Sequence, residues 1–396
     1  MSIVSTTLCY PNPTAPTQGI FVRRRLEAIA RLMPVTVISP VPWFPRMRPI
    51  CFDPACGQKE VPAVRYPRMF YLPGIAKSLD AAFYDRTLRA EVIRLRHQMP
   101  VRLIDAHFEW PDGVGAFRSA RKLGIPFVCT LRGKLVSRLK HRAIRRQLVE
   151  MLRGADALIA VSKSLAELAG DAAGQNLPIR VIPNGVDRSI FRRFAEKQSC
   201  ESPSQEARMA LGWSADARYA VSVGHLQSLK GFARLIELWP QIRRRVGDVR
   251  LALVGGPAGE PDYENRLQRL VRDFRLGEVV TFAGRIDPQR VSQMLNAADL
   301  FVLASRSEGW CNALAESLAC GCPAVASDVG GNREIVTDPK LGRLVALEDH
   351  DRWIEVIAAA LQRSWDRDWI AEKGGRRDWQ QVAAECVDVF KGILGD

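Results

Sequence analysis

The stretch from Asp299 to Glu334 constrains the fold of this chain of 396 residues more than any other. It contains two short apolar runs, Leu300 to Ala304 and Ala324 to Ala326, and a helical pattern from Trp310 to Cys320 lies between them. A glycine and a proline follow the helical pattern and end it. A strand, a helix and a second strand in this order predict one βαβ unit of a parallel sheet.

Two glutamates stand out within this unit. Glu308 lies in the loop before the helix, next to Ser307, which occupies the expected N-cap position. Glu316 lies on the helix about two turns further on, along the face that also carries Asn312. Free amides at a helix N-terminus bind anions, so the amides of residues 311–314 could hold a diphosphate while Glu316 accepts hydrogen bonds from a sugar diol. Glutamates at these positions can also be a cap and a solvated helix residue, and the flanking sequence is needed to decide.

The flanking motifs extend over nearly the whole chain. EGWCNALAESLACGCPAVASDVGG resembles the E-x7-E signature region of the family-4 glycosyltransferases, and the resemblance continues at VIPNGVDRSIF, VSVGHLQSLKGFARLI and AGRIDPQRVSQMLNAADLFVLAS. YPNPTAPTQGIFVRRRLEAIA and DAHFEWPDG are similar to members that build bacterial exopolysaccharide or teichuronic-type polymers. The resemblance implies the α/β fold called GT-B, in which two Rossmann-like domains face each other across a cleft and a C-terminal helix crosses back to the first domain. It also implies transfer of a sugar, with retention of configuration, from a nucleotide-diphosphate sugar.

The domain boundaries follow from the resemblance, in which the Pro183-Asn184-Gly185 turn closes the first domain, and from the polar stretch Arg192 to Ser214, which holds the linker. We expect an acceptor-binding domain over residues 1–190, a nucleotide-sugar-binding domain over 191–375 and the returning helix within 376–396, where Trp379 to Leu394 has a helical pattern. The length suits two domains that each bury a core. We expect the N-terminus to form a first strand rather than a signal peptide, because it lacks a basic segment and a small-residue cleavage site.

The resemblance assigns most of the donor site to the second domain. Lys230 takes the position of the family lysine that grips the diphosphate, whereas His225 replaces the arginine that shares this task. Glu308 is expected to contact the transferred sugar and Glu316 the ribose. The remaining expected donor-binding residues are the pair where relatives seat the nucleobase, the first turn of the helix and its preceding loop, and one glycine of the first domain: Gly284, Arg285, Gly309, Asn312, Ala313, Leu314 and Gly19.

The candidate catalytic residues of the first domain lie where apolar runs end. His107 follows Leu103 to Ala106, and Arg132 follows Phe127 to Leu131. Ligands bind at the carboxyl ends of strands in open α/β sheets, so we expect His107 and Asp112 to contact the sugar or the acceptor. A loop histidine held by local hydrogen bonds is the alternative. Many relatives carry histidine in place of Arg132; because arginine stays protonated, it cannot be a general base and is expected to bind an anionic group.

Several classes of site are not expected. The nine cysteines form no paired C-x2-C clusters, which argues against structural zinc and fits a reducing cytosol. No apolar run approaches the ~20 residues that span a bilayer. Asp-x-Asp occurs only at Asp349 to Asp351 and Asp366 to Asp368, in helical or surface stretches. We therefore expect no metal and no cofactor, with the nucleotide-diphosphate sugar as co-substrate.

Basic residues are concentrated in the first half of the chain. Residues 1–190 contain 29 Lys and Arg against 14 Asp and Glu, a net charge of +15, whereas the remainder has −1. A basic helix is predicted from Leu135 to Arg153. The stretch from Trp43 to Pro73 is predicted to be an irregular surface loop, which either lies near the acceptor or has a structural role only. The outward-facing arginines of the helix are Arg138, Arg142, Arg145 and Arg146.

This charge leads to a hypothesis about location and acceptor. We expect the first domain to dock peripherally on the anionic inner face of the cytoplasmic membrane and to glycosylate a lipid-linked glycan for cell-surface polysaccharide. A solvated basic surface is the alternative. A nucleotide-sugar epimerase or phosphorylase could use the same fold, because fold alone does not decide chemistry. No nucleic-acid partner is expected, because the basic segments lack interleaved aromatic residues.

Overall fold

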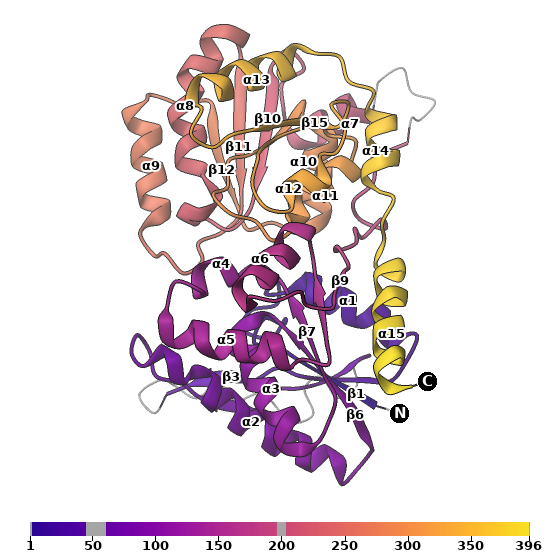
Figure 1. Cartoon of the computed structure of the whole chain (residues 1–396). Coiled ribbons are helices and arrows are strands. Elements are labelled where there is room, and N and C mark those ends of the chain that lie inside the picture. The colour runs from indigo at the N-terminus through magenta and orange to yellow at the C-terminus, as the bar shows by residue number, and fades with distance from the viewer. Residues whose placement is uncertain (1, 45–60, 196–202, 396) are drawn as a thin grey trace. The chain divides into compact units, whose positions relative to one another are not determined.

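The computed structural model describes residues 2–44, 61–195 and 203–395 (Figure 1). The chain divides into two compact units. Unit 1 consists of Met1–Gly185 and Trp379–Asp396, and unit 2 is Val186–Asp378. The sequence predicts divisions after residues 190 and 375, whereas the structure divides after residues 185 and 378.

Unit 1 is built on a parallel sheet with the described strands in the order β4-β2-β1-β6-β7-β8-β9. These strands are β1 (Ser2–Thr6), β2 (Val35–Ile38), β4 (Ala63–Arg65), β6 (Val101–His107), β7 (Phe127–Leu131), β8 (Ala157–Ala160) and β9 (Ile179–Val181). Strands β1, β2 and β7 are buried along their whole length, as expected for parallel strands covered on both faces. The register places Ser5 beside Asp105 and His107 beside Thr130. Site residues therefore meet at the carboxyl end of this sheet.

Helices cover the sheet of unit 1. They are α1 (Ile20–Ala30), η1 (Lys77–Leu79), α2 (Asp80–Arg96), η2 (Glu109–Gly113), α3 (Val114–Leu123), α4 (Leu135–Arg138), α5 (Arg142–Gly154) and α6 (Lys163–Ala173). The C-terminal helix α15 spans Trp379–Leu394, the bounds that its helical pattern predicts, and lies beside α1 (Figure 1). Phe390 and Cys386 of α15 join Leu26 and Ile29 of α1 in one buried cluster. This contact confirms that the last helix returns to the first unit.

The basic helix predicted from Leu135 to Arg153 is wrong as a single element. The chain leaves helical geometry at His141, whose extended backbone (φ −98°, ψ 108°) separates α4 from α5. Arg142 and its neighbours Arg145 and Arg146 are exposed on α5, whereas Arg138 lies on α4 and is partly buried. The outward arginines therefore belong to two helices.

The stretch from Trp43 to Pro73 is also more regular than predicted. Its residues 45–60 lie outside the described residues. The rest includes β4 at the edge of the main sheet and β5 (Arg68–Phe70), which pairs in parallel with β3 (Val41–Trp43). Sequence periodicity missed β3, β4 and β5 because each contains only three residues.

Unit 2 is a second parallel sheet, with the described strands in the order β12-β11-β10-β13-β14-β15. The strands are β10 (Arg218–Val223), β11 (Val249–Val254), β12 (Val280–Gly284), β13 (Leu300–Leu303), β14 (Ala324–Ser327) and β15 (Gly342–Val345). The helices are α7 (Pro203–Leu211), η3 (Ser228–Lys230), α8 (Phe232–Val246), α9 (Tyr263–Asp273), α10 (Pro288–Ala297), α11 (Asn312–Ala319), α12 (Asn332–Ile335), α13 (His350–Gln362) and α14 (Arg367–Gly374). Two parallel sheets covered by helices confirm the predicted α/β class.

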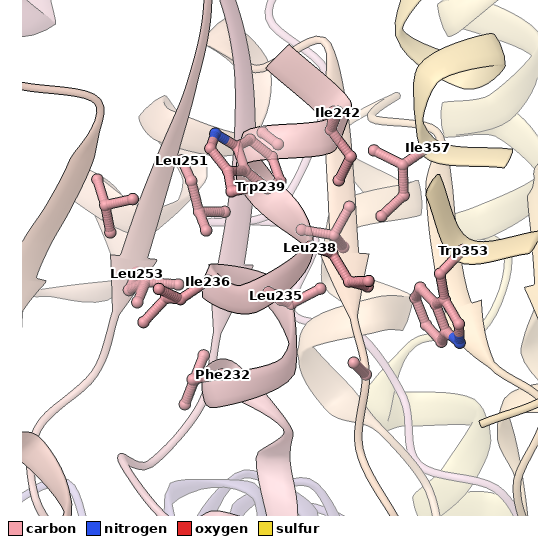
Figure 2. Packing of buried hydrophobic residues seen from close by; sticks show 14 of the residues in the cluster. Phe232, Leu235, Ile236, Leu238, Trp239, Ile242, Leu251, Leu253, Trp353 and Ile357 are labelled. Carbon is pink, nitrogen blue, oxygen red and sulfur yellow. The ribbon is translucent and has the colours of Figure 1, made fainter. Parts of the chain in front are cut away.

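The core of unit 2 fixes the helix that follows η3. Figure 2 shows Ile236 and Trp239 of α8 facing Leu251 and Leu253 of β11, and Leu235 of α8 belongs to the same buried cluster. All five side chains are at most 1% exposed. Burying a large apolar side chain contributes about 1.5–3 kcal/mol, so this packing holds α8, and the loop before it, against the sheet.

The predicted βαβ unit is present as β13, α11 and β14, and β13 pairs in parallel with β14. The helix is shorter than predicted because it begins at Asn312 rather than Trp310. Cys311, not Ser307, is its N-cap residue, and it makes no side-chain capping hydrogen bond. The cap prediction was wrong because residues 305–311 form a longer loop that folds back toward η3, where the amide of Arg306 donates to the carbonyl of Leu229 at 2.9 Å.

Candidate functional site

The centre of the candidate donor site in unit 2 is an ion pair between two loops. Nζ of Lys230, the last residue of η3, donates to Oε1 of Glu308 at 2.6 Å. Their side chains are 20% and 8% exposed. Burial disfavours the charge on Lys230, but Glu308 outweighs it and raises the pKa of the lysine. The pair joins the segment after β10 to the segment after β13, at the carboxyl ends of neighbouring strands, where ligands of open α/β sheets bind.

A third loop of unit 2 closes on Glu308 from the segment after β14. The amide of Gly331 donates to the carbonyl of Glu308 at 3.3 Å. Gly330 has φ +50°, and a Cβ at this position would lie 1.8 Å from the same carbonyl oxygen. Only glycine allows this approach, because it tolerates positive φ and has no Cβ. The paired glycines of the sequence thus hold the backbone of Glu308 in place.

Helix α11 presents its N-terminus directly after this loop. The amides of its first turn, from Asn312 to Leu314, carry the partial positive charge of the helix dipole. Glu316 lies one turn further on and is half-buried, whereas Cys311 is buried and has a pKa raised to about 12 by that burial and by Glu308. Because the thiol is neutral, it does not repel an anion at the start of the helix. Lys230 and the helix dipole can therefore attract an anion there.

Two further basic side chains lie near Lys230. His225 is exposed in the loop after β10, and Arg285 is exposed directly after β12, which ends at Gly284. Partial burial lowers the pKa of His225, and the charges of Lys230 and Arg285 lower it further. His225 is therefore neutral at pH 7 and does not supply the charge of the arginine it replaces. The predicted residues Lys230, His225 and Arg285 come together around one point.

In unit 1 the candidate residues form a buried hydrogen-bond network. Asp105 Oδ2 lies 3.1 Å from Nε2 of His107 and accepts from the hydroxyl of Ser5 at 2.9 Å. On the other side of the ring, Nδ1 of His107 lies 3.1 Å from Nη2 of Arg132. Nη1 of Arg132 donates to Oδ1 of Asn184 at 3.2 Å. His107 and Asp105 are at most 1% exposed, so His107 is held by internal partners.

The partners of His107 define its protonation state. A carboxylate only accepts hydrogen bonds and a guanidinium only donates them. Nε2 therefore carries the proton toward Asp105, and Nδ1 is the acceptor for Arg132. Burial lowers the pKa of His107 to about 4, a shift that Asp105 opposes and Arg132 strengthens. His107 is thus a neutral ring of one tautomer that orients Arg132.

Arg132 is a cation held in a fixed position. Its backbone amide and that of Gly133 donate to Oε1 of Glu109 at 2.8 and 3.1 Å, and its guanidinium lies 5.2 Å from the ring centroid of Phe21. Burial, together with the charge of Arg25, lowers the pKa of Arg132 to about 9. It remains protonated at neutral pH, as required for a group that binds an anion.

Two predicted residues of unit 1 have structural partners. Asp112 accepts a hydrogen bond from the amide of Leu8 at 2.5 Å, and its burial raises its pKa to about 6. Gly19 has φ +66°, and a Cβ at this position would lie 2.0 Å from the carbonyl oxygen of Cys9. The fold by itself thus requires glycine at this position.

Sequence reasoning missed four residues of this network. Asp105 lies two residues before His107 in the same strand, and this spacing on one face was a signal that could have identified it. Ser5 and Asn184 come from segments distant in sequence, and Glu109, two residues after His107, follows the end of β6 and carried no such signal. Within residues 2–44, 61–195 and 203–395, no group of three or more His, Cys, Asp and Glu is arranged to hold a metal ion.

Comparison with known protein families accounts for both units. The model described as Glycosyltransferase Family 4 matches residues 18–190, and the model described as Glycosyl transferases group 1 matches residues 203–377. The chain belongs to glycosyltransferase family 4. It is a retaining glycosyltransferase that uses a nucleotide sugar, which confirms the resemblance drawn from the motifs.

Curated relatives of this glycosyltransferase include a D-inositol 3-phosphate glycosyltransferase and a teichuronic acid glycosyltransferase. The chain is 31% identical to a D-inositol 3-phosphate glycosyltransferase of Acidothermus cellulolyticus, over 80% of this chain and 72% of that protein. It is 30% identical to the glycosyltransferase TuaC of Bacillus subtilis, which is named for teichuronic acid biosynthesis, over 95% of this chain and 96% of that protein.

Solved structures confirm the GT-B fold. A sucrose-phosphate synthase from Thermosynechococcus elongatus has a TM-score of 0.80 at 21% identity and covers 100% of this chain and 99% of its own. The Anabaena protein HepE in complex with UDP-glucose has a TM-score of 0.76 at 20% identity, with coverages of 99% and 100%. In the described part of this glycosyltransferase, no helix is long and apolar enough to cross a membrane.

Proposed function

We propose that unit 2 binds a nucleotide-diphosphate sugar and that unit 1 binds a lipid-linked glycan acceptor, which receives the sugar during synthesis of a cell-surface polysaccharide. The observation that carries the donor half is the 2.6 Å pair of Lys230 and Glu308 beside the N-terminus of α11. A partly buried cation and helix amides stabilise the charge that develops on a departing diphosphate. Binding of donor can turn Lys230 from Glu308 to the phosphates.

Each donor-site residue then has a specific task. Glu308 contacts the transferred sugar, and Glu316, one turn into α11, accepts hydrogen bonds from the ribose. Gly284 and Arg285 seat the nucleobase at the end of β12. The sugar and the diphosphate are lined by the backbone of Gly309 and by the amides of Asn312, Ala313 and Leu314. Gly19 of unit 1 allows the backbone to approach the donor closely.

The acceptor half rests on charge and on similarity along the chain. Unit 1 carries 29 Lys and Arg against 16 Asp and Glu, a net charge of +13, whereas unit 2 has +1. A soluble nucleotide sugar held by unit 2 does not require this excess in unit 1. A lipid-diphosphate-linked acceptor on an anionic membrane does call for positive charge in unit 1. Arg132 is a preformed cation for an anionic group of the acceptor or donor. The similarity to TuaC over nearly the full length of both chains supports a polymer of the cell surface.

The test begins with the donor. Thermal-shift measurements with a set of nucleotide sugars identify the donor, since a ligand bound to the native state raises the melting temperature. The Anabaena protein HepE was solved with UDP and UDP-glucose, so uridine nucleotides are the first candidates.

The second step measures release of nucleoside diphosphate with and without a polyprenyl-diphosphate-linked saccharide. We expect release that depends on the acceptor and a product one sugar longer. Conversion of the donor without acceptor would instead favour an epimerase, and release that requires inorganic phosphate would favour a phosphorylase.

A further inference from the structure

Exposed apolar side chains gather on one segment of unit 1. The segment Phe70–Leu79 joins β5 to α2, and three of its side chains are strongly exposed: Phe70 (39%), Ile75 (64%) and Leu79 (48%). Val136 of α4 is 42% exposed. The sequence from Arg68 to Leu79 contains no Asp or Glu. Asp80, the next residue, is buried, so no exposed acidic side chain adjoins this segment in sequence, which favours a surface that meets an apolar partner.

Hydrogen bonding and charge link this segment to α4 and α5. Nε2 of Gln147 on α5 donates to the carbonyl of Ser78 at 3.2 Å. Asp80, which begins α2, has a pKa raised by burial and partly lowered by the charges of Lys77 and Arg138. The apolar segment therefore lies beside α4 and beside the middle of α5 on unit 1.

A basic depression lies on α5 next to α6. It is lined by Arg142, Arg145 and Arg146, with Ala143 and Val149 of α5 and Ala172 of α6 between them. None of the three arginines forms an ion pair within the described part of the chain. Three unneutralised guanidinium groups around small apolar side chains suit phosphate oxygens above an apolar base.

We propose that these features form one docking face, made of the segment Phe70–Leu79, Val136 and the three arginines Arg142, Arg145 and Arg146, and that its partner is an anionic lipid bilayer. The arginines bind phosphate headgroups, and Ile75 and Leu79 enter the boundary between headgroups and acyl chains. This inference rests on the proposed lipid-linked acceptor and adds the surface and the mode of attachment. Charge alone would hold the enzyme above the bilayer, whereas apolar insertion keeps it bound when salt screens the charges.

The test measures partition of the full chain onto sedimented vesicles of phosphatidylcholine with or without phosphatidylglycerol, at low and high salt. Each basic residue near an anionic leaflet strengthens binding about fivefold. Replacing Arg142, Arg145 and Arg146 by serine should therefore weaken binding to phosphatidylglycerol vesicles about 100-fold at low salt. The matched control replaces three exposed arginines of α9 in unit 2, Arg266, Arg269 and Arg272, by serine and should bind as wild type.

The insertion step has its own pair of variants. The double variant Ile75→Ser and Leu79→Ser should lose the binding that survives high salt, by about 10-fold or more. The control, Leu32→Ser with Ile93→Ser, removes two apolar side chains that are 55% and 43% exposed outside the docking face and should leave binding unchanged. Equal melting temperatures show that all variants fold. Salt-resistant binding that is the same in both double variants would overturn insertion.

An activity assay separates this inference from the proposed function. The docking variants should transfer sugar to a detergent-solubilised, lipid-linked acceptor as fast as wild type, and lose transfer to the same acceptor in vesicles. If the wild type does not bind phosphatidylglycerol vesicles but glycosylates the solubilised acceptor, the proposal of a docking face is wrong and the proposed function stands. If it binds vesicles through these residues without glycosylating any lipid-linked acceptor, the docking face stands and the proposed acceptor is wrong.

Discussion

His107 offers the sharpest test of how unit 1 holds Arg132. The variants His107→Asn and His107→Phe both remove the imidazole, but only asparagine can place a side-chain oxygen where Nδ1 accepts from Nη2 of Arg132 at 3.1 Å. Both variants lose the Nε2 proton that faces Asp105 at 3.1 Å. The difference between them therefore isolates the hydrogen bond to Arg132.

The magnitude follows from the charge and burial of Arg132. A hydrogen bond to a charged group contributes about 1.5–3 kcal/mol, and Arg132 is only 9% exposed, so water cannot fully replace the lost acceptor. If Arg132 must be oriented for transfer, kcat/KM of His107→Phe should lie about 10- to 150-fold below that of His107→Asn, since each 1.36 kcal/mol is tenfold in rate. The asparagine variant should retain the larger part of the activity.

The pH dependence provides a second readout. The pKa of His107 is lowered to about 4, so the native state prefers the neutral ring and the unfolded chain takes up a proton near pH 6.5. Its contribution to stability is therefore complete above pH 6.5 and is lost as the pH falls toward 4, by about 3 kcal/mol in total. Urea unfolding of wild type and His107→Asn at pH 7 and pH 4.5 measures this, and the variant should lose less stability in acid.

The outcome that refutes the orienting role is specific. Equal kcat/KM for the two variants, at equal melting temperatures, would show that the bond to Arg132 is not used. A wild-type rate profile with an ionisation near pH 6.5 that disappears in His107→Asn would show that His107 titrates in the working range and is not the buried neutral ring described above.

Four other predictions concern Lys230 and Glu316 of the donor site, the buried Asp112 of η2, and activity without a metal ion. Lys230→Ala should lower kcat about 10²- to 10³-fold, because Lys230 is a preorganised cation for the diphosphate; normal activity per folded molecule in nucleoside-diphosphate release would contradict this. Glu316→Gln should weaken nucleoside-diphosphate binding by about 1.5–3 kcal/mol in calorimetry and leave the melting temperature unchanged. Asp112→Asn should stabilise the protein at pH 7 by up to about 3 kcal/mol but not at pH 4, because the raised pKa of about 6 makes the carboxylate costly above that pH; urea unfolding at both pH values checks this. Activity should survive excess EDTA, and complete loss that manganese restores would contradict transfer without a metal.

Local pattern determined much of the fold. The apolar run of β7, Phe127–Leu131, and the helical pattern of α15, Trp379–Leu394, have the bounds that the sequence predicts. The βαβ unit that contains α11 was also predictable, because a continuous apolar strand, an amphipathic helix and a Gly-x-Pro stop are decided by neighbouring residues. Lys230 and Glu308 were recognised from motifs that lie 78 positions apart, and the parallel sheet brings both to one edge.

Only the tertiary structure decided how the first-unit residues act. Nothing local in the sequence pairs Arg132 with His107, 25 positions earlier, or with Asn184, 52 positions later. Strand register places these residues together, and burial then sets the protonation state of the histidine. Likewise, the sequence alone did not predict the exposure of Ile75 or the division of the basic helix at His141. Both depend on which side chains the neighbouring segments leave uncovered.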